Sequence, residues 1–126
     1  MNTLNVASLH FEHTVWVKEL SFYKEQIKLY ADRVEELTKK NNHQKIREEL
    51  TQFKNQFIAQ NEVIDTLNHK IKLQEEELVA AEKENPIKAS KTKFEDQEGM
   101  YSEMAKFHSI YNELKVKFLR FCEEWM

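Results

Sequence analysis

The chain has 126 residues, of which 33% are charged and 40% hydrophobic, with one glycine, one proline and one cysteine. This length predicts a single domain over residues 1–126, and the scarcity of glycine and proline, the two costliest residues inside a helix, favours long helices. The net charge of −3 argues against nucleic acid as a partner, because binding to phosphates depends on an excess of Lys and Arg.

The single cysteine and the lack of long apolar runs predict a cytoplasmic protein that does not bind membranes. Cys122 cannot form an intrachain disulfide because the chain holds no second cysteine. The N-terminal residues show no basic start followed by an apolar run, so no signal peptide is expected. No stretch approaches the roughly 18 consecutive apolar residues of a membrane-spanning helix.

The first predicted helix covers approximately residues 8–40, and residues 1–7 are expected to be loosely ordered. Ser8 is suited to cap its start, because a serine hydroxyl accepts a free backbone N–H. Apolar residues recur at alternating steps of four and three, the spacing of a heptad seam. This seam contains Leu9, His13, Trp16, Leu20, Tyr23, Ile27, Tyr30, Val34 and Leu37.

The second predicted helix covers approximately residues 43–84, between the polar break KKNNHQ and Asn85-Pro86. The helix ends there because the residue before a proline is driven out of the helical region. Two glutamines occupy positions in its seam, which contains Ile46, Leu50, Phe53, Phe57, Gln60, Ile64, Leu67, Ile71, Gln74, Leu78 and Ala81.

The third predicted helix covers approximately residues 93–125. Thr92 and Glu95 have the spacing of a capping box, and Gly99 is expected to weaken the helix by about 1 kcal/mol relative to alanine. The expected seam contains Phe94, Tyr101, Met104, His108, Tyr111, Phe118, Cys122 and Trp125, widened on one side by Phe107, Leu114 and Phe121. Short connections make consecutive helices antiparallel, so the sequence predicts an all-α, elongated, up-down-up three-helix bundle with coiled-coil-like heptad seams.

Three histidines, His10, His13 and His108, are candidate metal ligands. His10 and His13 lie three residues apart, and counting outward from the two hairpin turns places His13, His69 and His108 at one level of the rod. Imidazole nitrogens bind transition metals such as zinc, which takes about four ligands in a closed site. Two alternatives need no cofactor: a polar core layer that fixes the helix register, and a layer that responds to pH.

A second apolar stripe follows the outer side of the first predicted helix and contains Phe11, Val15, Phe22 and Leu29. The last three are seven residues apart, so they share one face away from the seam. An aligned apolar stripe of this kind usually contacts a partner, and closed two-fold dimers are the commonest oligomers. We therefore expect a homodimer or a contact with another protein; the alternative is that this helix is more deeply buried within the monomer.

Motifs that carry catalysis or cofactor binding are missing from the sequence. No histidine follows a glutamate by three residues as in di-iron bundles, His-Glu-x-x-His does not occur, and one glycine excludes a phosphate-binding glycine loop. The sequence therefore predicts a non-enzymatic bundle that acts through protein–protein contacts, as a scaffold, adaptor or self-association module. The alternative is a metal-binding bundle that uses His10, His13 and His108.

Overall fold

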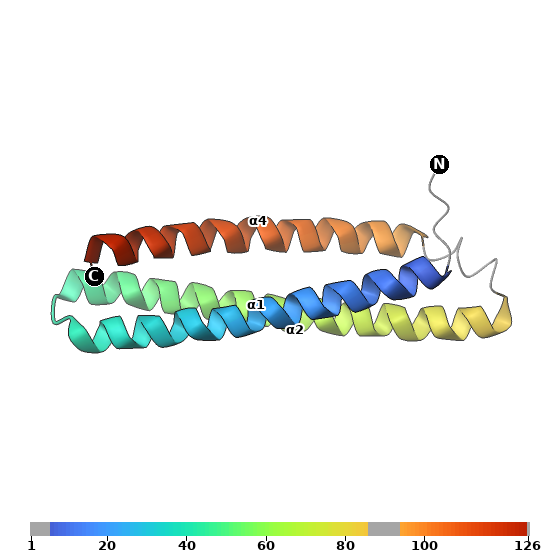
Figure 1. Cartoon of the computed structure of the whole chain (residues 1–126), viewed down its shortest axis with the longest axis horizontal. Helices are drawn as coiled ribbons and strands as arrows, with labels where there is room; N and C mark the ends of the chain where they lie inside the picture. The colour runs from blue at the N-terminus through green and yellow to red at the C-terminus, as the bar shows by residue number, and fades with distance from the viewer. Residues whose placement is uncertain (1–5, 86–93, 126) are drawn as a thin grey trace.

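The structure, a computed structural model, describes residues 6–85 and 94–125. These residues form three helices, α1 (Val6–Lys40), α2 (Gln44–Glu84) and α4 (Phe94–Trp125), and contain no strand. The helices lie side by side as a long rod in which α2 runs antiparallel to both α1 and α4 (Figure 1). The predicted all-α, elongated, up-down-up bundle is therefore confirmed.

The start of α1 differs from the sequence-based expectation. Val6 and Ala7 are helical, although loose order was expected there, and residues 1–5 lie outside the described residues. Val6 is only 8% exposed and packs with Leu9 and Leu78 in a small apolar cluster of its own. This burial extends the helix past Ser8, which lies inside α1 and is not its cap.

One larger apolar cluster runs along the rest of the rod and joins all three helices. Most of the predicted seam residues of α1 and α2 belong to it, including Trp16, and His13 is buried one turn before Trp16. Full burial of a large apolar side chain stabilises the fold by about 1.5–3 kcal/mol. The cluster includes side chains with no exposed surface: Leu20, Leu50, Phe57, Ile64, Met100, Tyr111 and Phe118.

The buried face of α4 agrees only in part with the predicted seam. Tyr101 and Trp125 are each 45% exposed and His108 is half-buried, so these seam assignments were wrong. Four members of the predicted seam are buried as expected, and so is the flank that was expected to widen it: Met104, Tyr111, Phe118 and Cys122, with Phe107, Leu114 and Phe121. Gln97 and Met100 extend this face toward the start of the helix. Thr92 and the side chains of Phe94 and Glu95 lie outside the described part of the chain, with the predicted capping box.

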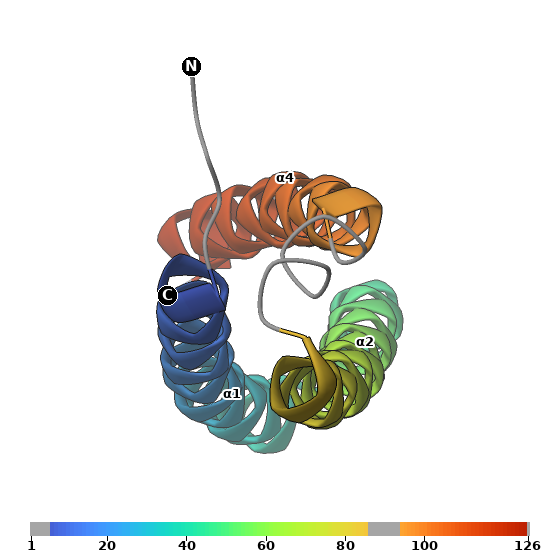
Figure 2. The ribbon, with the colours of Figure 1, turned by 90° about the vertical axis from the view of Figure 1, so that its right-hand side faces the viewer.

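Aromatic rings fill the space between α1 and α4. The backbones of α1 and α2 lie close together along more of their length than those of the other helix pairs. Between α1 and α4, by contrast, the Tyr23 ring lies 5.2 Å from that of Tyr111 and 5.3 Å from that of His108, measured between centroids. Tyr111 also donates a 2.5 Å hydrogen bond to Gln26 Oε1. An end view shows the three helices surrounding a common axis (Figure 2).

Within residues 6–85 and 94–125, none of the three helices combines the length and the apolar composition that crossing a membrane requires.

Candidate functional site

His10 and His13 meet two glutamates of α2 at the α1–α2 interface, forming what we call the histidine–glutamate cluster: His10, His13, Glu75 and Glu82. The two oxygens of Glu75 each accept a hydrogen bond, one from His10 Nδ1 at 2.6 Å and one from His13 Nδ1 at 2.7 Å. Glu82 Oε1 lies 3.2 Å from His10 Nε2. Residues three apart on one helix point the same way, which lets a single carboxylate bridge both rings.

The geometry of this cluster favours a protonated His10. A carboxylate only accepts hydrogen bonds, so the two His10 nitrogens can both donate only when the ring is an imidazolium. Burial is the largest influence on the pKa of His10 and lowers it, but the hydrogen bonds to Glu82 and Glu75 and the charges of both outweigh it and leave the pKa raised. Burial likewise raises the pKa of Glu75, whereas the bonds from His13 and His10 outweigh it and leave that pKa lowered.

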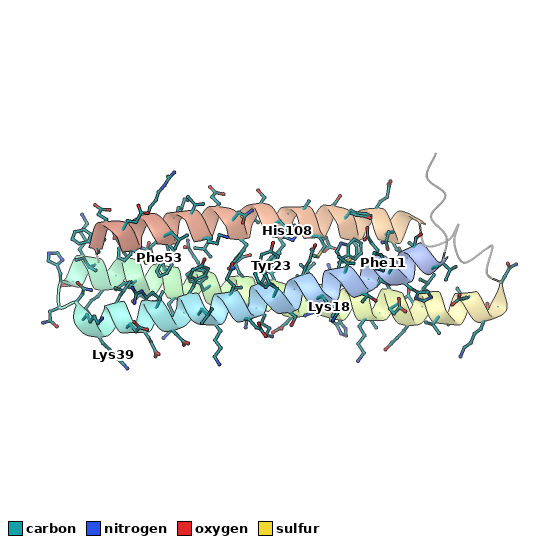
Figure 3. All side chains as sticks on the ribbon, viewed as in Figure 1. Phe11, Lys18, Tyr23, Lys39, Phe53 and His108 are labelled. Atoms are coloured by element: carbon teal, nitrogen blue, oxygen red, sulfur yellow. The ribbon has the colours of Figure 1, made fainter. Side chains whose placement is uncertain are left out.

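His108 lies apart from this cluster. Its Nε2 is 3.5 Å from Glu19 Oε2 and makes no hydrogen bond within residues 6–85 and 94–125, and its ring packs on Tyr23 (Figure 3). The side chain of His69 is exposed. The predicted common level of His13, His69 and His108 is wrong, because His13 faces Glu75 on α2 while His108 lies beside Tyr23 and Glu19 on α1. His13 faces Glu75, between one and two helical turns from His69, because the path of the hairpin turn shifts the helix levels.

The predicted metal ligands are thus only partly brought together. His10 and His13 lie side by side, whereas His108 lies elsewhere in the bundle. In the part of the chain that the structure describes, no group of three or more His, Cys, Asp or Glu side chains is arranged to hold a metal ion. The sequence analysis missed Glu75 and Glu82. Both carboxylates come from the glutamate-rich end of α2. Only the position of α2 along α1 determines which of these glutamates face the histidines.

The second apolar stripe, Phe11, Val15, Phe22 and Leu29, lies mostly on the surface. Phe11 and Leu29 are each 68% exposed and Phe22 is 59% exposed, whereas Val15 is half-buried. The alternative, that the first helix is more deeply buried within the monomer, is wrong for Phe11, Phe22 and Leu29. α1 therefore has two apolar faces, one covered by α2 and α4 and one left uncovered within a single chain.

Two charged side chains, Lys18 and Glu25, complete the stripe. Both are exposed. Together with the four apolar residues they continue the alternating steps of four and three from position 11 to position 29, so the outer face of α1 repeats the spacing of a helix-packing seam. This surface can accept a second helix, with apolar contacts at its centre and ionic contacts beside them.

Comparisons of the chain with protein-family models, with curated proteins and with solved structures found no match. The function is therefore inferred from the geometry of the histidine–glutamate cluster and of the apolar stripe. The histidine–glutamate cluster joins α1 to α2 by ionic hydrogen bonds inside the bundle. The stripe, in contrast, faces outward, where another molecule can reach it.

Proposed function

We propose that the protein is a non-enzymatic helical bundle that acts through protein–protein contacts, as a scaffold, adaptor or self-association module. The observation that supports this function is the exposure of Phe11, Phe22 and Leu29 in one line on α1. Contact between large apolar side chains and water is unfavourable, so covering them drives association. A long, regular helix also presents them in fixed positions, which lowers the entropic cost of binding.

The proposed partner is a second copy of the chain, in a homodimer, because closed two-fold dimers are the commonest oligomers. Another protein is the alternative partner. We also propose a cytoplasmic location, since the single cysteine excludes an intrachain disulfide, and coiled-coil-like packing, since buried residues follow heptad spacing. Neither a nucleic acid nor a membrane is part of this proposal.

The experiment that tests the proposal is the substitution Phe22→Glu, followed by sedimentation velocity across a range of concentrations. A charge placed in an apolar contact is costly to desolvate. We therefore expect the dissociation constant of the dimer to rise by about 100-fold. Val116→Glu is the matched control, because Val116 is 43% exposed but lies on α4. Circular dichroism checks that both variants keep their helices. An unchanged oligomeric state for Phe22→Glu would show that the outer face of α1 is not the contact surface.

A metal-binding bundle that uses His10, His13 and His108 is the alternative function, with a transition metal such as zinc. The observation in its favour is that His10 and His13 share one carboxylate, Glu75. The separate position of His108 beside Glu19 makes this function less well supported than protein contact. Native mass spectrometry of untagged protein tests it: the alternative requires a bound metal that His13→Ala releases.

A further inference from the structure

We infer that two copies of the chain associate along α1 in an antiparallel, two-fold arrangement centred on Phe22. This inference rests on the proposed function, since it names the partner and the geometry of the same apolar stripe. It is carried by two independent properties of the outer face of α1: the placement of its apolar residues and the order of its charges.

Three of the four apolar residues of the stripe are placed symmetrically, with Val15 and Leu29 on either side of Phe22. Val15 precedes Phe22 by seven residues and Leu29 follows it by seven. A two-fold axis through Phe22, perpendicular to the helix, therefore brings the two Phe22 side chains together and sets Val15 of each copy opposite Leu29 of the other. The least exposed residue of the stripe, Val15, then meets one of the most exposed, Leu29, at both ends of the contact.

The charges distinguish antiparallel from parallel pairing. Lys18 lies four residues before Phe22 and Glu25 three residues after it, and both side chains are exposed. In the antiparallel arrangement Lys18 of each copy lies within one helical turn of Glu25 of the other, which gives two attractive pairs. Parallel pairing in register would oppose Lys18 to Lys18 and Glu25 to Glu25, and like charges in contact are unfavourable. The charge order thus selects the antiparallel arrangement.

The size of the stripe suits a dimer of ordinary affinity. A phenylalanine side chain buries roughly 150–250 Å² when it is fully covered. Phe11 is 68% exposed and Phe22 is 59% exposed, so a partner that covers both would bury about 250 Å² of their surface per chain. With Leu29 included, two chains contribute about 700 Å², more than half of the roughly 1,200 Å² of a small specific interface. The aliphatic stems of Lys18 and the neighbouring polar residues supply the rest.

Disulfide cross-linking tests the direction of pairing. In a Cys122→Ala background, which removes the native thiol, chains carrying Val15→Cys are mixed with mass-labelled chains carrying Leu29→Cys and then oxidised. We expect the mixed 15–29 disulfide to dominate. Predominant 15–15 and 29–29 disulfides would overturn the antiparallel arrangement and leave the proposed protein-contact function standing. A chain that sediments as a monomer at every concentration and forms no cross-link would overturn both.

Charge reversal gives a second test, and it needs no change at Cys122. We expect Lys18→Glu or Glu25→Lys alone to weaken dimerisation by about tenfold, because each replaces two attractive pairs by two repulsive ones. The double variant Lys18→Glu/Glu25→Lys should restore wild-type dissociation, since the pairs re-form with their signs exchanged. Lys54→Glu, at an exposed position on α2, is the matched control and should have no effect. A double variant as weak as the single variants would refute the Lys18–Glu25 pairing.

Discussion

Replacement of Glu75 by glutamine should destabilise the protein in mild acid and have little effect in mild base. The Glu75 carboxylate accepts hydrogen bonds from both His10 and His13. A glutamine amide oxygen still accepts from one neutral imidazole, and its NH2 group can donate to the unprotonated Nδ1 of the other, but the amide carries no charge to stabilise an imidazolium. The substitution therefore removes the electrostatic part of the histidine–glutamate cluster and keeps its shape.

The pH range of the effect follows from the directions of the two pKa shifts. The pKa of His10 is raised above its ordinary 6.5, so its contribution to stability is complete below 6.5 and is lost as pH rises through the raised value. The pKa of Glu75 is lowered below its ordinary 4.5, so its contribution is complete above 4.5 and is lost as pH falls through the lowered value. The cluster therefore stabilises the fold most between those two ordinary values.

The expected magnitude is moderate because water reaches the cluster. Hydrogen bonds to charged groups contribute about 1.5–3 kcal/mol each where they are shielded. The side chains of His10 and Glu75 are 29% and 37% exposed, whereas that of His13 is 6% exposed. Solvent screening reduces the combined electrostatic contribution to about 1–2 kcal/mol. We expect Glu75→Gln to lower the free energy of unfolding by this amount in mild acid.

Urea unfolding followed by circular dichroism, at about pH 5.5 and about pH 8.5, measures this difference. Glu76→Gln is the matched control, since Glu76 is the next residue of α2 and its side chain is exposed. The control corrects for the loss of one negative charge from the chain. Equal destabilisation by Glu75→Gln at both pH values would refute the argument, because the pH dependence comes only from protonated histidine.

Two further predictions concern the stability of the bundle. Gly99→Ala should stabilise the protein by about 0.5–1 kcal/mol, because Gly99 lies inside α4 and an added Cβ meets no atom within 4 Å; a melting temperature below that of the wild type would contradict this. Phe57→Ala should cost about 3–5 kcal/mol, because the Phe57 ring is 0% exposed and packs on those of Tyr30 and Phe118. A urea midpoint close to that of the wild type would contradict the second.

The seam of α1 could be predicted from the sequence because it is the longer of the two heptad lines on this helix and, unlike the outer stripe, contains no Lys or Glu. Leu9, Trp16, Leu20 and Ile27 are buried as expected, and His13 is buried among them. The heptad spacing admitted only one continuous line through these positions, even though one member is polar. Periodicity alone therefore located the core face of this helix and the inward direction of one histidine.

The seam of α4 was harder to predict because both flanks of this helix are apolar. Tyr101 and Trp125 on one flank compete with Phe107, Leu114 and Phe121 on the other, and either set gives a heptad line. The bundle buries the second set. Which flank is buried depends on where α1 and α2 lie around α4, and the apolar pattern of α4 alone does not determine this.

The histidine–glutamate cluster was only half predictable. His10 and His13 are neighbours on one helix, so their proximity follows from sequence spacing. Their contact with Glu75 depends on how far α1 and α2 slide along each other. A connecting turn of a few residues does not determine that axial shift to within one helical turn. A different shift would bring another residue of α2 next to the two histidines.

The aromatic packing between α1 and α4 gives the protein an internal optical reporter. Trp16 is 5% exposed and its ring lies 5.0 Å from that of Tyr101 on α4, edge to face. The other tryptophan, Trp125, is 45% exposed at the end of α4. Trp16 fluorescence therefore responds to the docking of α4 on α1. In a Trp125→Phe background, stopped-flow fluorescence would follow the arrival of the third helix separately from the growth of helical structure.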